Sequence, residues 1–277
     1  MPGRFDPLAP SGSSALLTDH YELTMLQASL ADGTARRRCV FEVFARSLPP
    51  GRRYGVVAGT GRVLDALEAF HFTGDQLDWL ADADVVDDAT LAYLADYRFT
   101  GSVTGYGEGD CYFPQSPVLT VEAPFGEAVV LETLLLSILN HDSAVASAAS
   151  RMTVAATGRP CVEMGSRRTH EAAAVASARA AYVAGFTSTS NLEAGHRYAI
   201  PTRGTSAHAF TLVHGSETDA FASQLAALGV GTTLLVDTYD VSEGVRRAVQ
   251  AAGPGLGAVR LDSGDLLELA GRVRRLL

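Results

Sequence analysis

The sequence predicts an α/β protein in which an N-terminal α+β layer is followed by a parallel β/α barrel-like domain, incomplete at its C-terminus. Two observations support this fold class. After residues 159–160, short apolar strands alternate regularly with helix-like segments, whereas the earlier chain mixes helices with strands broken by Gly and Pro. We expect a flexible tail over 1–14, an α+β domain over 15–125 and the partial barrel-like domain over 126–277.

Composition and charge narrow the classes of protein that fit. The chain has 277 residues and is 47% hydrophobic, so it is long and apolar enough to form one large core. Its formal net charge of -9 argues against a surface that binds nucleic acid. Its 3 cysteines are odd in number and far apart, which implies neither a disulfide framework nor a CxxC metal site. A reducing, cytoplasmic location fits best.

The N-terminus and the most apolar segment give no membrane or export signal. The first 14 residues are rich in Pro, Gly and Ser and lack a basic start before an apolar run. The segment 128–139 is interrupted by Glu132 and ends in a polar Asn-His-Asp sequence. We expect it to be a buried helix that is too short and too polar to span a bilayer.

Periodicity identifies the elements of the α+β part. Leucines recur at helical spacing before Gly33, which supplies a helix stop. Alternating apolar residues in the run RCVFEVFAR predict a half-buried strand. Helices are expected near 18–33, 63–70 and 91–97, and strands near 38–46 and within 99–121.

Five β/α units are expected in the second part. Three of their helices have recognisable starts, because Ser216, Ser242 and Asp265 have the residue type of an N-cap. The alanine-rich segment 171–184 predicts a helix that packs closely against the sheet. The expected strands lie near 161–165, 186–191, 202–208, 232–239 and 258–261.

Polar residues collect at the C-terminal ends of these five strands. In a parallel barrel that end is the mouth where ligands bind, so we expect the side chains to face one cavity. Cationic side chains can bind phosphates, and carboxylates can bind ribose hydroxyls or a metal. A cavity with both would suit a phosphorylated sugar as ligand. The residues are Glu163, Arg167, Arg168, Ser190, Asn191, Thr205, His208, Asp237, Asp240, Arg260, Asp262 and Asp265.

His208 is the strongest catalytic candidate, because it follows the small, polar sequence PTRGTSA and can accept a proton or a phosphoryl group near neutral pH. Taken alone, a single histidine is more often structural. Asp237 on the next predicted strand could hold the imidazole in the required tautomer. Tyr21 could likewise be an ordinary helix residue, and Arg167 and Arg168 could be a solvated helix start that opposes the helix dipole.

Six motifs together resemble the nicotinate phosphoribosyltransferase family. They occur in the family's order along nearly the whole chain: TDHYELTM at 18–25, EMGSRR at 163–168, TSN at 189–191, GTSAH at 204–208, VDTYD at 236–240 and RLDSGD at 260–265. The resemblance implies that nicotinate and phosphoribosyl pyrophosphate condense to nicotinate mononucleotide and pyrophosphate, in NAD salvage. It also implies ATP and Mg²⁺ as cofactors, with ATP hydrolysis coupled through a phosphohistidine at His208.

The same resemblance assigns roles to individual residues. Tyr21 would stack on the pyridine ring, reaching into the site of a neighbouring subunit, which implies a homodimer. Arg167, Thr205 and Arg260 would contact nicotinate or its reaction partner, and Arg168 adds a cation that can hold an anion.

Three further residues carry distinct expectations. Asn191 lies where related nicotinamide-using enzymes carry an acid, so a neutral side chain there favours nicotinate over nicotinamide. Asp262 has no helix to cap, so it is a better candidate than Asp265 for binding ribose or a metal. Asp265 has two equal readings, as the N-cap of the last helix and as a ligand-binding residue.

The chain departs from the family in length. Family members continue beyond RLDSGD with further strands and a glycine-rich loop that holds the ribose 5'-phosphate. We therefore expect either a fragment of a longer enzyme or a chain complemented by another polypeptide. Two alternatives stay open: a non-catalytic remnant that binds nicotinate or phosphate or only dimerises, and another phosphosugar-binding barrel enzyme.

Overall fold

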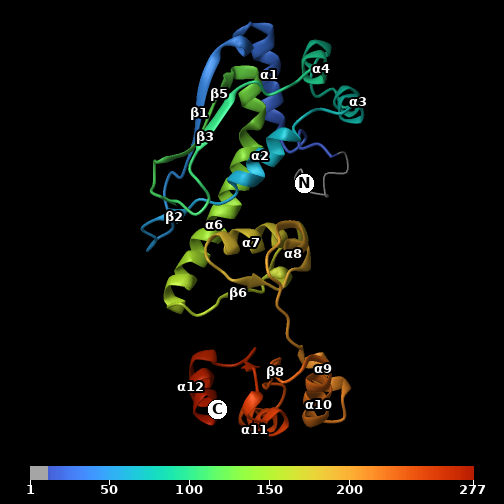
Figure 1. Ribbon diagram of the computed structural model, residues 1–277. Helices are drawn as coiled ribbons and strands as arrows, with labels where there is room; N and C mark the ends of the chain where they lie inside the picture. The colour runs from blue at the N-terminus through green and yellow to red at the C-terminus, as the bar shows by residue number, and fades with distance from the viewer. Residues whose placement is uncertain (1–11) are drawn as a thin grey trace. The chain divides into compact units, whose positions relative to one another are not determined.

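The computed structural model describes residues 12–277, which form two compact units (Figure 1). The first unit ends at Thr202 and the second is Arg203–Leu277. The predicted boundary at 125/126 lies inside the first unit, within the short helix α5 (Phe125–Ala128). Of the predicted tail, residues 1–11 lie outside the described residues, and Ser13 and Ser14 are buried.

The first unit contains a mixed set of helices and short strands. Its first half comprises α1 (His20–Ala31), η1 (Thr34–Arg36), β1 (Arg38–Phe44), β2 (Gly55–Val56), α2 (Thr60–Glu68), α3 (Gly74–Asp82), α4 (Asp88–Ala95), β3 (Ser102–Gly105), β4 (Cys111–Tyr112) and β5 (Pro117–Pro124). Its second half comprises α5 (Phe125–Ala128), η2 (Val129–Leu131), α6 (Glu132–Ala156), β6 (Val162–Glu163), η3 (Ser166–Arg168), α7 (Glu171–Val183), β7 (Ser188–Thr189) and α8 (Leu192–Tyr198).

A three-stranded antiparallel sheet in the order β1-β5-β3 supports the core of the first unit. Phe41 pairs with Val121 and Cys39 with Ala123, so the apolar face predicted for β1 lies beside the buried face of β5. Helices α1, α2, α4 and α6 contribute buried leucines and valines to the same core. The expected half-buried strand and the helices near 18–33, 63–70 and 91–97 are thereby confirmed.

Helix α6 is longer than the sequence predicted. By length and composition alone, the helical stretch Phe125–Ala156 is long and apolar enough to cross a membrane. Within its apolar 18-residue segment, 56% is buried inside the structure. The expectation that this helix is too short and too polar to span a bilayer is therefore wrong by length and composition. The helix continues beyond the apolar segment 128–139, where the polar residues find partners within the fold. Asp142 is fully buried and binds the Arg62 guanidinium, whose Nη1 lies 2.9 Å from Oδ1.

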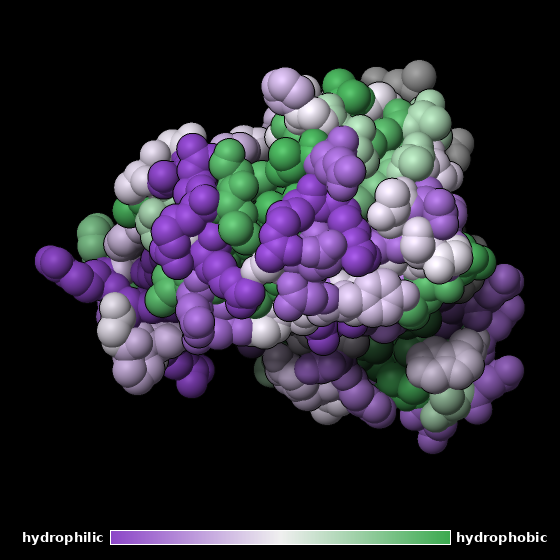
Figure 2. Space-filling view, turned by 90° about the horizontal axis from the view of Figure 1, so that it is seen from below, coloured by the Kyte–Doolittle hydropathy of each residue, from purple (hydrophilic) through white to green (hydrophobic). Residues whose placement is uncertain are grey.

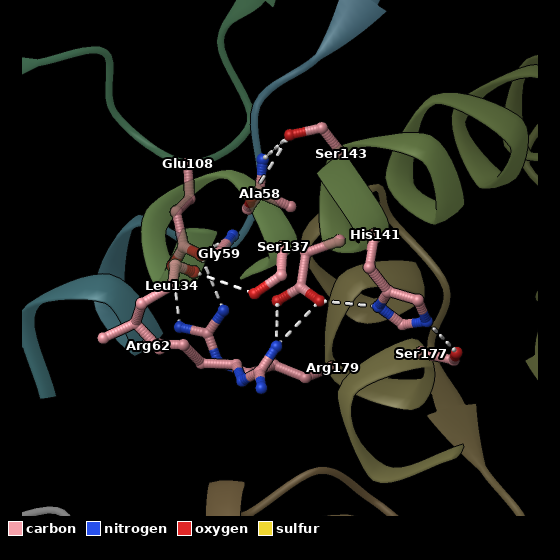
Figure 3. A network of polar contacts seen from close by, with 11 residues as sticks. Ala58, Gly59, Arg62, Glu108, Leu134, Ser137, His141, Ser143, Ser177 and Arg179 are labelled. Carbon is pink, nitrogen blue, oxygen red and sulfur yellow. Dashed lines mark hydrogen bonds and ion pairs between the residues drawn. The ribbon is translucent and has the colours of Figure 1, made fainter. Parts of the chain in front are cut away.

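A network of polar contacts joins α2, α6, α7 and the loop before β4 (Figure 3). Arg179 of α7 donates two hydrogen bonds to Glu108, at 2.6 and 2.7 Å. Glu108 in turn accepts from the Gly59 N–H at 2.7 Å, which precedes α2. Burial of these charges is tolerated because each carboxylate is paired with a guanidinium.

The end of the first unit contains a two-stranded parallel pair. Glu163 of β6 pairs with Thr189 of β7. The alanine-rich helix α7 was expected to pack against the sheet, but it packs mainly against α6. The third expected strand, 202–208, is absent among the described residues. Thr202 makes only an isolated bridge to Thr189, the next five residues have no regular structure, and His208 begins a helix.

The second unit is a parallel strand pair covered by helices. Its elements are α9 (His208–Val213), α10 (Glu217–Leu228), β8 (Thr233–Leu235), α11 (Val241–Ala252), η4 (Gly253–Gly255), β9 (Ala258–Arg260) and α12 (Leu266–Leu276). Its core consists of Phe221, Leu234, Val236, Val245, Ala248 and Val273. On the one face drawn in Figure 2, hydrophilic residues are interspersed with apolar ones.

Two of the three predicted helix caps in this unit are confirmed. The Ser216 hydroxyl accepts from the Asp219 N–H at 3.1 Å, and Asp265 accepts from the Leu267 N–H at 3.0 Å. The prediction for Ser242 is wrong, because the N-cap of α11 lies two residues earlier. Its N-cap is Asp240, whose carboxylate accepts from the Glu243 N–H at 2.8 Å.

Candidate functional site

The parallel pairing of β8 and β9 brings two polar strand ends together. Leu235 pairs with Arg260, and the Val236 N–H donates to the Arg260 carbonyl at 3.2 Å, so both strands end at the same edge. Asp237 follows one strand and Asp262 the other. The predicted collection of polar residues at strand ends therefore holds for this pair, as parallel strands require.

A glycine of α11 allows that helix to lie against the end of β8. A Cβ atom on Gly244 would lie 2.4 Å from the Val236 carbonyl oxygen, closer than any side chain tolerates. Only a residue without a Cβ therefore fits at this contact. The helix that follows β8 thus fixes the backbone immediately before Asp237.

The carboxylate of Asp237 is buried and held on one side only. Its side chain is 1% exposed. Oδ2 accepts from the Asp262 N–H at 2.7 Å and from the Ser263 hydroxyl at 2.8 Å, whereas buried Oδ1 has no hydrogen-bond partner among residues 12–277. Burial alone would raise the pKa of Asp237, but these hydrogen bonds, together with nearby His208, bring that pKa below its ordinary value.

The imidazole of His208 lies beside this unpaired oxygen. Its Nε2 is 3.9 Å from Asp237 Oδ1 and 3.8 Å from Asp262 Oδ2, within ion-pair range but too far for a hydrogen bond. Its Nδ1 is 3.2 Å from Thr238 Oγ1. The side chain is 39% exposed, so the ring combines a carboxylate environment with access from outside.

Arg260 links the strand end to the loop before His208. Its Nη1 donates to Thr205 Oγ1 at 2.7 Å and to the Ser206 carbonyl at 3.3 Å, and its Nη2 donates to Asp262 Oδ1 at 2.5 Å. The guanidinium is 24% exposed. Four residues expected to act together, Thr205, His208, Arg260 and Asp262, therefore lie in one cluster with Asp237.

Sequence reasoning missed Thr238 and Ser263 as members of this cluster. Both residues lie inside the motifs VDTYD and RLDSGD, directly after Asp237 and Asp262. The sequence feature that could have identified both residues was a hydroxyl side chain directly after a motif aspartate. Asp265 caps α12 by accepting from the Leu267 and Glu268 N–H groups, so the structure gives it the capping role.

The first unit holds the other predicted residues. Arg167 and Arg168 lie in the 3-10 turn η3, are exposed, and have no ion pair to any residue that the structure describes. Asn191 caps α8 by accepting from the Ala194 N–H at 2.9 Å, and its Nδ2 donates to Ser166 Oγ at 3.1 Å. Two uncommitted guanidinium groups on a short turn can pair with an anion.

Tyr21 is exposed on α1, next to a buried carboxylate. Its ring is 46% exposed, whereas Glu22 is fully buried. Glu22 Oε1 accepts from the Thr133 N–H at 2.8 Å and from the Thr133 hydroxyl at 2.6 Å, which holds α1 against the start of α6. Burial raises the pKa of Glu22, and the hydrogen bonds from Thr133 offset part of that rise.

The predicted residues are thus distributed over two units, and the predicted convergence of all five strand ends on one cavity stays a prediction. Within the second unit, a half-exposed imidazole faces two carboxylates and lies near an arginine. This arrangement can hold a cationic imidazole and can bind an anionic group beside it. It is chemically suited to nucleophilic or proton-transfer chemistry on a phosphorylated compound.

Comparisons with known proteins identify relatives of the chain. Residues 16–140 match the family model of the nicotinate phosphoribosyltransferase (NAPRTase) N-terminal domain. Nicotinate phosphoribosyltransferase pncB1 of Mycobacterium tuberculosis (strain ATCC 25618 / H37Rv) is 59% identical over 99% of this chain and 62% of its own length. Nicotinate phosphoribosyltransferase of Bacillus subtilis (strain 168) is 38% identical over 96% of this chain and 55% of its own length.

Solved structures agree with the sequence matches. The crystal structure of human nicotinic acid phosphoribosyltransferase superposes with a TM-score of 0.80 at 28% identity, over 94% of this chain and 63% of that chain. A nicotinate-nucleotide pyrophosphorylase from Pyrococcus furiosus gives a TM-score of 0.79 at 26% identity, over 95% and 62%. These matches support the α/β fold class.

The chain spans 62% of the length of pncB1, so the matches cover this part of the relatives only. The matches to curated relatives run along nearly the whole chain. The resemblance predicted from the motifs is therefore confirmed: the chain is similar to nicotinate phosphoribosyltransferases along nearly its whole length.

Proposed function

We propose that this protein is a nicotinate phosphoribosyltransferase, which joins nicotinate to phosphoribosyl pyrophosphate and releases nicotinate mononucleotide and pyrophosphate. ATP hydrolysis is coupled to the reaction through a phosphohistidine at His208. The observation that carries the proposal is the placement of His208 between Asp237 and Asp262, with Arg260 in the same cluster. The names of the relatives, both nicotinate phosphoribosyltransferases, support the substrate assignment.

In the phosphorylation step, a ring nitrogen of neutral His208 attacks the γ-phosphorus of ATP. A nitrogen–phosphorus bond forms, and ADP leaves with the electron pair of the broken phosphorus–oxygen bond. The ring becomes cationic as it reacts, and the ionised carboxylates of Asp237 and Asp262 stabilise that charge. The lowered pKa of Asp237 keeps this carboxylate charged at neutral pH.

Mg²⁺ fits the oxygen atoms that this cluster leaves open. Asp237 Oδ1 is a buried acceptor without a hydrogen-bond partner in the described chain, and the Asp262 side chain is 38% exposed. One or two carboxylates together with phosphate oxygens and waters are the usual protein environment of Mg²⁺. When bound, Mg²⁺ would neutralise phosphate charge during transfer.

The substrate anions require cations from this chain. Arg260 has donors directed at Thr205 and Asp262, and it can bind a carboxylate or phosphate by exchanging one of these partners. Arg167 and Arg168 supply uncommitted guanidinium groups. Exposed Tyr21 would stack on the pyridine ring in the site of a second subunit, which makes a homodimer part of the proposal.

The proposal also includes the barrel-like fold and the cellular location of the protein. The two parallel strand pairs, β6-β7 and β8-β9, are consistent with successive parts of a barrel-like domain that needs further strands to close. We also propose a cytoplasmic location, since the 3 cysteines form no disulfide in the described structure.

The test is nicotinate mononucleotide formation by the purified chain from nicotinate and phosphoribosyl pyrophosphate, with and without Mg-ATP. ATP-stimulated product that is lost in His208→Ala supports the proposal. The matched control is His196→Ala, since the His196 side chain is 87% exposed and lies on α8. Absence of product from the folded chain contradicts activity of this polypeptide and favours the reading as a binding remnant.

A further inference from the structure

One hydrogen-bonding group meets the imidazole of His208 on the side away from the carboxylates. Thr238 Oγ1 lies 3.2 Å from His208 Nδ1, and no other side chain in the described part of the chain is within hydrogen-bond distance of that ring. Thr238 directly follows Asp237. The end of β8 therefore places the two residues that face the two ring nitrogens.

The surroundings of Nε2 decide where the ring proton lies. Nε2 faces two carboxylate oxygens, Asp237 Oδ1 and Asp262 Oδ2, at 3.9 and 3.8 Å. Ionised carboxylates are acceptors only, so a lone pair on Nε2 would face two negative oxygens, whereas a proton there is attracted by both. In the neutral ring, Nδ1 then carries the lone pair and needs a donor.

The Thr238 hydroxyl is the donor in the right place, because a threonine hydroxyl can donate one hydrogen bond while its methyl group restricts the side-chain rotamer. A ring rotated by half a turn about the Cβ–Cγ bond would present carbon atoms to Thr238 and to the carboxylates. It would lose the polar contacts on both sides.

We propose that Thr238 is a positioning residue for His208: its hydroxyl donates to Nδ1, and this contact fixes the orientation of the ring with the Nε2 proton directed at Asp237 and Asp262. The inference deepens the proposed function, on which the importance of His208 rests. Thr238 itself touches no substrate in this account and acts through the imidazole.

The first experiment reads the ring nitrogens directly. Long-range ¹H–¹⁵N NMR spectra of the chain with ¹⁵N-labelled histidine, recorded above the pH at which the imidazole titrates, distinguish protonated, hydrogen-bonded acceptor and free acceptor nitrogens. We expect a protonated Nε2 and a hydrogen-bonded Nδ1 in the wild type. In Thr238→Val the Nδ1 resonance should move downfield to the position of a free acceptor, and Thr238→Ser should keep the wild-type position.

Valine has nearly the shape of threonine at this half-buried position, and Thr238→Ala gives a second variant without the hydroxyl should valine disturb folding. The matched control is Thr218→Val, an exposed threonine of α10 that lies outside the cluster and should leave the His208 resonances unchanged. A protonated Nδ1 in the wild type, or an unchanged Nδ1 resonance in both variants, overturns the inference.

Phosphorylation of His208 by Mg-ATP is measured separately in the wild type. In the neutral ring that this inference describes, Nδ1 carries the lone pair and is the nitrogen that attacks, so the Thr238 hydroxyl must leave it as the nitrogen–phosphorus bond forms. If the wild type is not phosphorylated at all, the proposed function fails, whereas the NMR spectra still decide the contact between Thr238 and His208.

Discussion

Asn191 donates a hydrogen bond from Nδ2 to Ser166 Oγ at 3.1 Å, so one side chain ties the start of α8 to the turn that carries Arg167 and Arg168. Its Oδ1 is engaged at the same time by the Ala194 N–H. A change at this position therefore acts both on local order and on charge near the two arginines. The two effects can be separated.

Asn191→Asp should change substrate preference and leave the fold intact. Aspartate caps helices as well as asparagine does, and the Ser166 hydroxyl can donate to the new carboxylate. The added charge should repel the carboxylate of nicotinate, lowering the ratio of kcat/KM for nicotinate to that for nicotinamide about tenfold or more, equivalent to about 1.4 kcal/mol. Ser166→Ala, which loses the contact without adding charge, is the control. An unchanged ratio in Asn191→Asp would show the specificity argument to be wrong.

Substitutions at Asp265 distinguish helix capping from ligand binding. Asp265→Ala should destabilise the second unit by about 1 kcal/mol, because two N–H groups of α12 lose their acceptor. Asp265→Asn should retain most of that stability in chemical denaturation. If Asp265→Asn nevertheless loses activity at full stability, the carboxylate also binds a ligand, and if both are retained its role is capping alone.

Gly244→Ala should disturb the site from outside it. The new Cβ would lie 2.4 Å from the Val236 carbonyl oxygen, so α11 or the end of β8 must move, at a cost of about 1–3 kcal/mol. Because Asp237 follows directly, phosphorylation of His208 should fall together with the melting temperature. Gly231→Ala, whose Cβ meets nothing within 4 Å, serves as the control and should be close to neutral. Equal stability of the two variants would contradict this packing argument.

Glu22→Gln should alter how stability depends on pH. Burial raises the pKa of Glu22 above its ordinary value of 4.5, so the folded state binds this proton more tightly than the unfolded state. The stability linked to Glu22 is fully present below pH 4.5 and is lost as pH rises through the higher, folded-state pKa. Glutamine mimics the protonated form, and its oxygen can still accept from Thr133.

The free energy of unfolding of Glu22→Gln relative to wild type should therefore increase from about pH 4.5 towards neutrality. Denaturant unfolding at a series of pH values measures this difference. Glu171→Gln, whose side chain is 79% exposed on α7, should show no such trend. A difference that stays constant with pH would mean that Glu22 titrates normally in the folded state.

Local sequence signals predicted the elements that local interactions stabilise. Alternation of apolar residues predicted β1, and alanine content predicted α7. Helix α3 was not predicted, although Thr73 and Gln76 have capping-box spacing in the sequence and form that box at its start. The region 202–208 resembled a strand by composition, but only Thr202 finds a pairing partner. Strand formation depends on a neighbour, which the local pattern does not contain.

By itself, the sequence determined the α/β class, the six family motifs and the residues at the ends of the strands, because these depend on residue type and spacing. Tertiary structure decided which residues meet. The register of β8 against β9 gives Asp237 the Asp262 and Ser263 donors. The packing of the loop before α9 places Thr205 beside Arg260, a residue 55 positions later. Thr238 became visible as the partner of His208 only through a distance between side chains that lie 30 residues apart. Such distances follow from strand pairing and helix packing through space, which spacing along the chain does not specify.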